Sequence, residues 1–91
     1  MVKYTININH FGPQEDYSKR ERTIKRIIEE CEGNIILNSR KVDIKATVHS
    51  QLQVIQFVEY LVYSGLEAHA CIHKNGGKNP NSCYLKLKVQ H

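Results

Sequence analysis

The sequence predicts an α+β domain in which two helices cover one face of an antiparallel sheet. Four short segments alternate apolar and polar residues, which is the pattern of strands with one buried face, and a fifth short segment is mainly apolar. Two longer segments repeat apolar residues every three or four positions, as helices packed on a core do. Along the chain these segments follow the order β-α-β-β-α-β-β.

The N-terminal third predicts one strand and one helix. Residues 2–9 alternate apolar and polar side chains and form the first strand. The helix is expected from Ser18 to Cys31, because Ser18 followed by Glu21 matches a capping box and Gly33 supplies a helix stop. Its core-facing side would carry residues spaced i, i+3, i+4 and i+7, namely Ile24, Ile27, Ile28 and Cys31.

The middle third predicts two strands and a second helix. Residues 34–37 form a short apolar strand, and residues 42–48 alternate again. Ser50 is a typical N-cap for a helix over residues 51–63, which Gly65 would end. The core-facing side of this helix would carry Val54, Ile55, Phe57, Val58, Leu61 and Val62. Its outward side would carry Leu52, Gln53, Gln56, Glu59, Tyr60 and Tyr63.

The C-terminal third predicts a strand pair. Residues 66–73 and 83–90 alternate, and a glycine- and asparagine-rich loop over residues 74–82 joins them. With right-handed crossovers and both helices on one face, the topology resembles a ferredoxin-like split β-α-β sandwich with a last strand added by a hairpin. The expected strand order is 5-4-1-3-2. Many unrelated functions use this topology, so the resemblance implies none of them.

One face of this sheet would remain open and mildly basic. Strict alternation places Cys71 on the open face and Cys83 on the helix side, so we expect these two thiols not to pair. The open face would present Lys3, Thr5, Asn7, Asn9, Asp43, Lys45, Thr47, Glu67, His69, Cys71, His73, Tyr84, Lys86 and Lys88.

The composition fits one small globular domain. A chain of 91 residues is too short for two domains, and a chain of that length buries roughly 60–65% of its unfolded surface on folding. Its 41% hydrophobic and 24% charged residues are outside the range of intrinsically disordered chains. No apolar run approaches the roughly 18 residues of a membrane span, and the N-terminus lacks a signal-peptide core. We therefore expect a cytoplasmic protein with no membrane partner.

The net charge indicates the kind of partner, and the cysteine content indicates whether disulfides or a zinc site are expected. Thirteen Lys and Arg against nine Asp and Glu give a formal net charge of +4, which favours anionic partners mildly. Cys31, Cys71 and Cys83 are odd in number and lack a Cys-x-x-Cys spacing, so they indicate neither a disulfide framework nor a zinc ribbon. We expect reduced thiols.

Enzymatic motifs are missing from the sequence. There is no glycine-rich phosphate loop, no Gly-x-Ser-x-Gly elbow and no His-Glu-x-x-His. Cys71 between His69 and His73 is the one arrangement typical of an activated thiolate, but an open sheet face offers no pocket that excludes water. Convergence of these three side chains on one zinc ion would be strained. We therefore expect a protein that is not an enzyme and that binds neither metal nor cofactor.

The leading functional hypothesis concerns the charges of the first helix. Five cations lie toward its N-terminal half and Glu29, Glu30 and Glu32 at its end, against the helix dipole, at about 0.3–1 kcal/mol for each misplaced charge. Pairing of Lys25 with Glu29 or Glu21 and of Arg26 with Glu30 would neutralise part of this charge. Docking of an anion would offset the rest. The expected ligand is a nucleic acid or a phosphorylated nucleotide, bound by Lys19, Arg20, Arg22, Arg26, Lys74, Lys78, Lys86 and Lys88.

The alternative hypothesis is a protein-interaction module, such as a small inhibitor or adaptor of the kind that mobile elements encode. The outward side of the second helix is less polar than a solvated face, and tyrosines are common interface anchors. We expect a homodimer or partner interface at Leu52, Gln56, Tyr60 and Tyr63. A basic surface continuous across the first helix, the glycine-rich loop, Lys86 and Lys88 would favour the first hypothesis, and an apolar surface around Tyr60 would favour the second.

Overall fold

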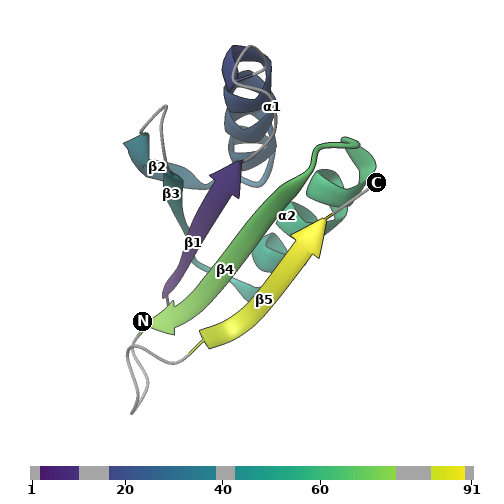
Figure 1. Ribbon diagram of the computed structural model, residues 1–91. Coiled ribbons are helices and arrows are strands. Elements are labelled where there is room, and N and C mark those ends of the chain that lie inside the picture. Colours follow the sequence, from purple (N-terminus) through teal and green to yellow (C-terminus); the bar gives the residue numbers. More distant parts are fainter. Residues whose placement is uncertain (1–2, 11–16, 39–42, 76–82, 90–91) are drawn as a thin grey trace.

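The structure confirms an α+β domain with two helices and one five-stranded sheet (Figure 1). This computed structural model describes residues 3–10, 17–38, 43–75 and 83–89. The elements are β1 (Lys3–His10), α1 (Tyr17–Glu30), β2 (Asn34–Asn38), β3 (Asp43–Val48), α2 (Gln51–Tyr63), β4 (Ala68–Asn75) and β5 (Cys83–Val89).

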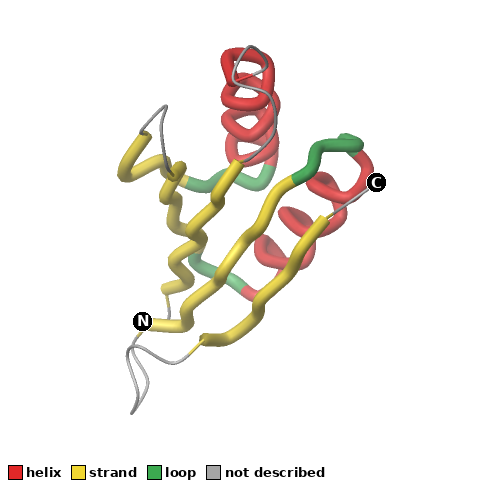
Figure 2. Tube along the Cα trace, viewed as in Figure 1, coloured by secondary structure: helices red, strands yellow, loops and turns green. Residues whose placement is uncertain are grey.

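The sheet is open and antiparallel throughout. Its order is β2-β3-β1-β4-β5, which is 5-4-1-3-2 counted from the β5 edge. The first strand, β1, is therefore central and pairs with β3 on one side and β4 on the other. Both helices lie behind the sheet in the view of Figure 2, so none of the described helices covers the opposite sheet face, which we call the open sheet face.

The core lies between that covered sheet face and the two helices. The helices contribute Ile24, Ile27, Ile28, Val54, Phe57 and Leu61, and the strands contribute the alternate residues Tyr4, Ile6, Ile8, Ile44, Ala46, Val48, Ala68, Ala70, Ile72 and Val89. The alternating strand pattern thus predicts the buried face of the central strands correctly, because one side of each strand faces the helices.

The termini of α1 differ from the sequence prediction. The helix begins at Tyr17, so Ser18 is an exposed helical residue and not an N-cap, and Glu21 instead forms an ion pair with Lys25, Oε1 to Nζ 3.1 Å. At the other end, the Glu32 amide donates to the Glu29 carbonyl at 3.0 Å and the next amide donates to the Ile28 carbonyl at 2.9 Å. This is a Schellman motif whose left-handed residue is Glu32, at φ 59°.

Gly33 follows that motif and has a packing role. A Cβ atom at this position would lie 3.1 Å from the Thr47 carbonyl oxygen and 3.1 Å from side-chain atoms of both Ile28 and Val48. The absence of a side chain therefore lets the chain enter β2 directly against β3 and the end of α1.

Gln53 joins the two helices, although the sequence predicts it on the outward side of α2. Ser50 is the expected N-cap, since its Oγ accepts a hydrogen bond from the Gln53 amide at 3.1 Å. The Gln53 side chain accepts from the His49 amide at 2.8 Å and donates to the Cys31 carbonyl at 2.9 Å. One side chain thus satisfies backbone groups at the start of α2 and the end of α1.

The buried stripe of α2 is narrower than expected. Val54, Phe57 and Leu61 are buried, whereas Ile55 and Val62 are 48% and 45% exposed. The prediction for Ile55 and Val62 is therefore wrong. The buried positions i, i+3 and i+7 form a single line along the helix. Ile55 and Val62 each follow one of these residues, so they lie about 100° round the helix and point away from the sheet.

A β-bulge reverses two further predictions at the start of β5. Ile72 pairs with Leu85 but His73 pairs with Cys83, so Tyr84 is an extra residue opposite β4. The Tyr84 ring consequently packs edge-on against the buried ring of Tyr4, with centroids 5.1 Å apart. Cys83 lies instead on the open face, where strict alternation would have placed Tyr84.

Candidate functional site

The predicted anion-binding cations do not form one continuous surface within the described residues. Lys19, Arg22 and Arg26 are exposed on α1, whereas Lys86 and Lys88 belong to the uncovered sheet face. Lys74 lies opposite Tyr4 in the register, at the end of β4 away from α1 (Figure 1). Lys78 and the rest of the glycine-rich loop, residues 76–82, lie outside the described residues.

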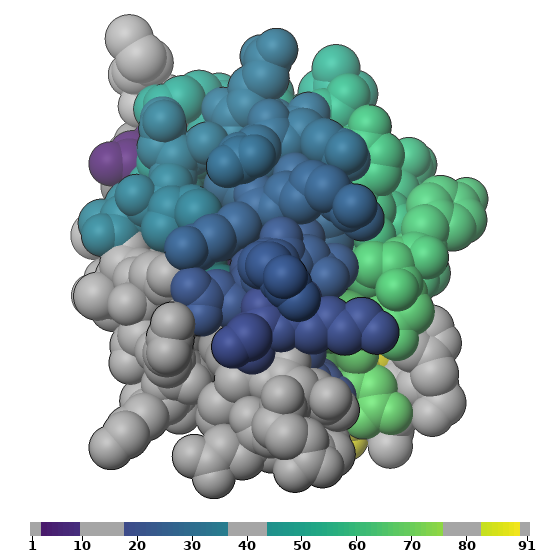
Figure 3. Space-filling view, turned by 90° about the horizontal axis from the view of Figure 1, so that it is seen from above, coloured from purple at the N-terminus to yellow at the C-terminus, as the bar shows by residue number. Residues whose placement is uncertain are grey.

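The first candidate surface is the basic strip of α1, which we define as Lys19, Arg22 and Arg26. Figure 3 shows α1 at the centre of one face of the molecule, with its side chains directed outward. Together with Thr23, the basic strip lines a shallow hollow of about 320 Å³. Within the part of the chain that the structure describes, none of its three cations has an acidic partner. The expected ion pair of Arg26 with Glu30 does not form there.

Arg20 is separate from this strip. Its Nη1 donates to the Glu67 carbonyl oxygen at 3.0 Å, and its Nε is buried without a hydrogen-bond partner among the described residues. Arg20 therefore attaches α1 to the segment between α2 and β4, and its role as a free anion ligand is not supported. Glu67 precedes β4 and lies on the helix side of the sheet, beside Arg20. The prediction that Glu67 lies on the open sheet face is therefore wrong.

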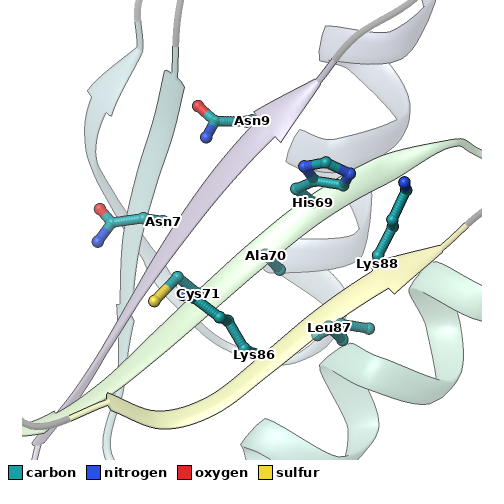
Figure 4. A pocket seen from close by; sticks show the side chains of 8 residues that line it. All are labelled: Asn7, Asn9, His69, Ala70, Cys71, Lys86, Leu87 and Lys88. Carbon is teal, nitrogen blue, oxygen red and sulfur yellow. The ribbon is translucent and has the colours of Figure 1, made fainter.

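The second candidate surface is the polar hollow of the open sheet face (Figure 4). It has a volume of about 450 Å³, and its polar lining consists of Asn7, Asn9, His69, Cys71, Lys86 and Lys88. The register places each β4 residue of this set between a β1 asparagine and a β5 lysine. Amide and ammonium donors on neighbouring strands suit an anionic group, as the sequence predicts for Lys86 and Lys88.

A thiol pair lies on the same open face. The Sγ atoms of Cys71 and Cys83 are 3.6 Å apart, which contradicts the expectation that these thiols point to opposite faces. The physical reason is the bulge at Tyr84, which turns Cys83 outward. The Cys71 Sγ is also 3.3 Å from Nε2 of His73.

The surroundings of Cys71 favour its protonated form. Burial, followed by the hydrogen bond to and charge of Cys83, raises the pKa of Cys71 above its ordinary value, while Lys86 lowers it. Within the described ranges, no group of three or more His, Cys, Asp or Glu side chains is arranged to hold a metal ion.

The third candidate surface is the α2 apolar face, which we define as Leu52, Ile55, Tyr60, Val62 and Tyr63. Leu52 is 63% exposed and Tyr63 84% exposed, while Gln56 beside them is half-buried. The sequence predicts Leu52, Tyr60 and Tyr63 here but not the two aliphatic residues, which enlarge the apolar area.

Comparison with protein-family models, with curated proteins and with solved structures finds no match for this chain. Neither of the described helices is long and apolar enough to cross a membrane. The chain's own surfaces therefore carry the functional proposal.

Proposed function

We propose that this chain is a cytoplasmic, non-enzymatic binding module for an anionic partner, either a nucleic acid or a phosphorylated nucleotide-type ligand. The proposal rests on α1 alone, because the basic surface expected to run from α1 to Lys86 and Lys88 is not continuous among the described residues. The observation that carries the proposal is the basic strip. Its three cations are exposed along one helix and have no acidic partner among the described residues, whereas their neighbour Lys25 is paired with Glu21. The cytoplasmic location rests on the three free cysteines, which are typical of a reducing compartment.

The spacing of the basic strip suits contacts with successive phosphates. Residues at i, i+3 and i+7 lie on one side of a helix and span roughly 10 Å along its axis, at 1.5 Å per residue. Arginine adds planar, bidentate hydrogen bonding to phosphate oxygens. Such contacts position a nucleic acid without reading its bases, so the proposed binding is weak and independent of sequence.

Base stacking on the sheet is not part of this proposal. Domains that read single-stranded RNA on an open sheet use aromatic rings of the strands. Among the described residues of the open face there is no Phe, Tyr or Trp, since Tyr84 packs against Tyr4 on the helix side. We also propose the ferredoxin-like split β-α-β arrangement for β1 to β4 with β5 added, an assignment that the central position of β1 supports.

A salt titration of binding tests the basic strip. The double variant Arg22→Ala with Arg26→Ala should lower the log–log salt slope for mixed-sequence duplex DNA by about two units, because each lost phosphate contact contributes close to one unit. The matched control is Arg22→Lys with Arg26→Lys, which keeps both positive charges on the basic strip and should keep a slope close to that of wild type. No binding by wild type to DNA, RNA or nucleotides at low salt, or equal losses in both double variants, would contradict the proposal.

A second candidate function is protein–protein interaction through the α2 apolar face. Five apolar or aromatic side chains exposed on one helix favour an interface with a second copy or another protein. We expect wild type to sediment as a homodimer at high concentration and Leu52→Ser with Tyr63→Ser to sediment as a monomer. Monomeric wild type at the highest attainable concentration would leave self-association without support.

A further inference from the structure

The thiol pair of the open sheet face is distinct from the basic strip and from the α2 apolar face. Cys83 is exposed on β5, which is an edge strand, while Cys71 is half-buried on the adjacent β4. Their sulfur atoms are already 3.6 Å apart. A disulfide requires an S–S distance near 2.05 Å, so an approach of about 1.5 Å is needed. The two strands are already paired, so rotation of the two cysteine side chains about χ1, without a shift of either strand, is the motion that would close this gap.

We propose that Cys71 and Cys83 form a redox-active dithiol that reacts with small-molecule disulfides and closes to an intramolecular disulfide. Two independent features of the chain bring the thiols together. The first is the pairing of β4 with β5, and the second is the bulge at Tyr84, without which Cys83 would face the helices.

The reaction is a pair of thiol–disulfide exchanges. The exposed Cys83 thiolate attacks one sulfur of R–S–S–R, which forms a Cys83–S–S–R mixed disulfide and releases RS⁻. The Cys71 thiolate then attacks the Cys83 sulfur, which forms the Cys71–Cys83 bond and releases the second RS⁻. The two protons of the protein thiols end on the two released thiolates. The protein dithiol loses two electrons and the small disulfide gains them.

The order of the two steps follows from the surroundings of each thiol. Cys83 is exposed and accessible to a reagent, whereas Cys71 is shielded and its raised pKa keeps it protonated. His73 Nε2, at 3.3 Å from Cys71 Sγ, is positioned to accept that proton when Cys71 attacks. His73 is thus a positioning and proton-accepting residue for the second exchange.

Cys31 provides an internal comparison. It is 1% exposed beneath α1 and is absent from the open face. Burial, with a smaller effect of Glu30, raises its pKa to about 11. A protonated and inaccessible thiol exchanges slowly, so Cys31 should stay reduced while the other two cysteines react.

The experiment uses oxidised glutathione as the probe, with intact-mass measurement and peptide mapping. Wild type should lose the mass of two hydrogens and yield a Cys71–Cys83 linked peptide, and reduced glutathione in excess should reverse the change. Cys71→Ser should stop as a stable glutathione adduct on Cys83. Cys31→Ser is the matched control and should behave as wild type does.

Three results would overturn the proposal. They are a stable glutathione adduct on Cys83 of wild type, disulfide-linked dimers on a non-reducing gel in place of the intramolecular bond, and a linked peptide that contains Cys31. The role of His73 is tested separately, by the lifetime of the mixed disulfide. His73→Gln should lengthen the life of the mixed disulfide without changing which two cysteines are joined, and an unchanged lifetime would remove the proton-accepting role.

Discussion

Replacing Phe57 with alanine should lower the free energy of unfolding by about 3–5 kcal/mol, the usual cost of truncating a buried aromatic side chain. Phe57 is 1% exposed and is the largest fully buried side chain among the described residues. It lies in the middle of the buried stripe of α2, between Val54 and Leu61. Its loss would leave a cavity at the contact between α2 and the sheet.

The measurement is equilibrium unfolding in urea followed by circular dichroism. The matched control is Tyr63→Ala, because Tyr63 belongs to the same helix and is 84% exposed. Its stability should change by no more than about 0.5 kcal/mol. Similar losses in the two variants would mean that α2 does not pack on the sheet by its Val54-Phe57-Leu61 stripe.

The second large effect is a loss of stability at alkaline pH that depends on Cys31. Burial raises the pKa of this thiol from 9.0 to about 11 in the folded protein. Above the ordinary pKa the unfolded chain releases the proton while the folded chain retains it, so the free energy of unfolding falls as pH rises through this window. A difference of roughly two pKa units corresponds to about 3 kcal/mol.

Urea unfolding at intervals from pH 8 to 11, where Tyr and Lys groups also titrate, would isolate this contribution by comparison with variants. Cys31→Ala should show a shallower fall with pH than wild type, whatever its stability at neutral pH. The matched control is Ile27→Ala, which removes a buried side chain of α1 that carries no titratable group, so its curve should run parallel to that of wild type. Parallel curves for wild type and Cys31→Ala would show that the Cys31 thiol is not buried as described.

The sequence predicts the main elements because local periodicity reflects burial. In β1 every second side chain faces the helices, and the alternation of residues 2–9 follows directly. In α1 the buried residues Ile24, Ile27 and Ile28 are the ones that the helical spacing selects. These features depend on which side of each segment is buried, and the spacing of apolar residues within that segment indicates this side directly.

Features that depend on two segments at once could not be predicted in this way. The bulge at Tyr84 follows from the register of β5 against β4, and one strand's alternation carries no sign of it. Gln53 looks like a solvent-facing residue of α2 until the end of α1 is placed beside it. Glu32 adopts the left-handed conformation normally taken by glycine, so the sequence favours its neighbour Gly33 for that role.

The candidate sites also contain some features that one segment predicts and others that depend on contacts between side chains or strands. The exposure of Lys19, Arg22 and Arg26 follows from the helical wheel, because all three lie away from the apolar stripe. The helical wheel does not predict the ion pairs, because Glu21 and Glu29 are each four residues from Lys25. Of these two described residues, only Glu21 forms the ion pair. The proximity of Cys71 to Cys83 required the observed register.

The most direct test of the central claim is a map of backbone amide shifts in nitrogen-15-labelled protein during titration with a short DNA duplex at low salt. Binding through the basic strip should place the largest shifts on residues 19–26 of α1, and these shifts should vanish in the Arg22→Ala, Arg26→Ala double variant. Shifts concentrated on β4 and β5, on α2, or on no element of the chain would contradict binding through the basic strip.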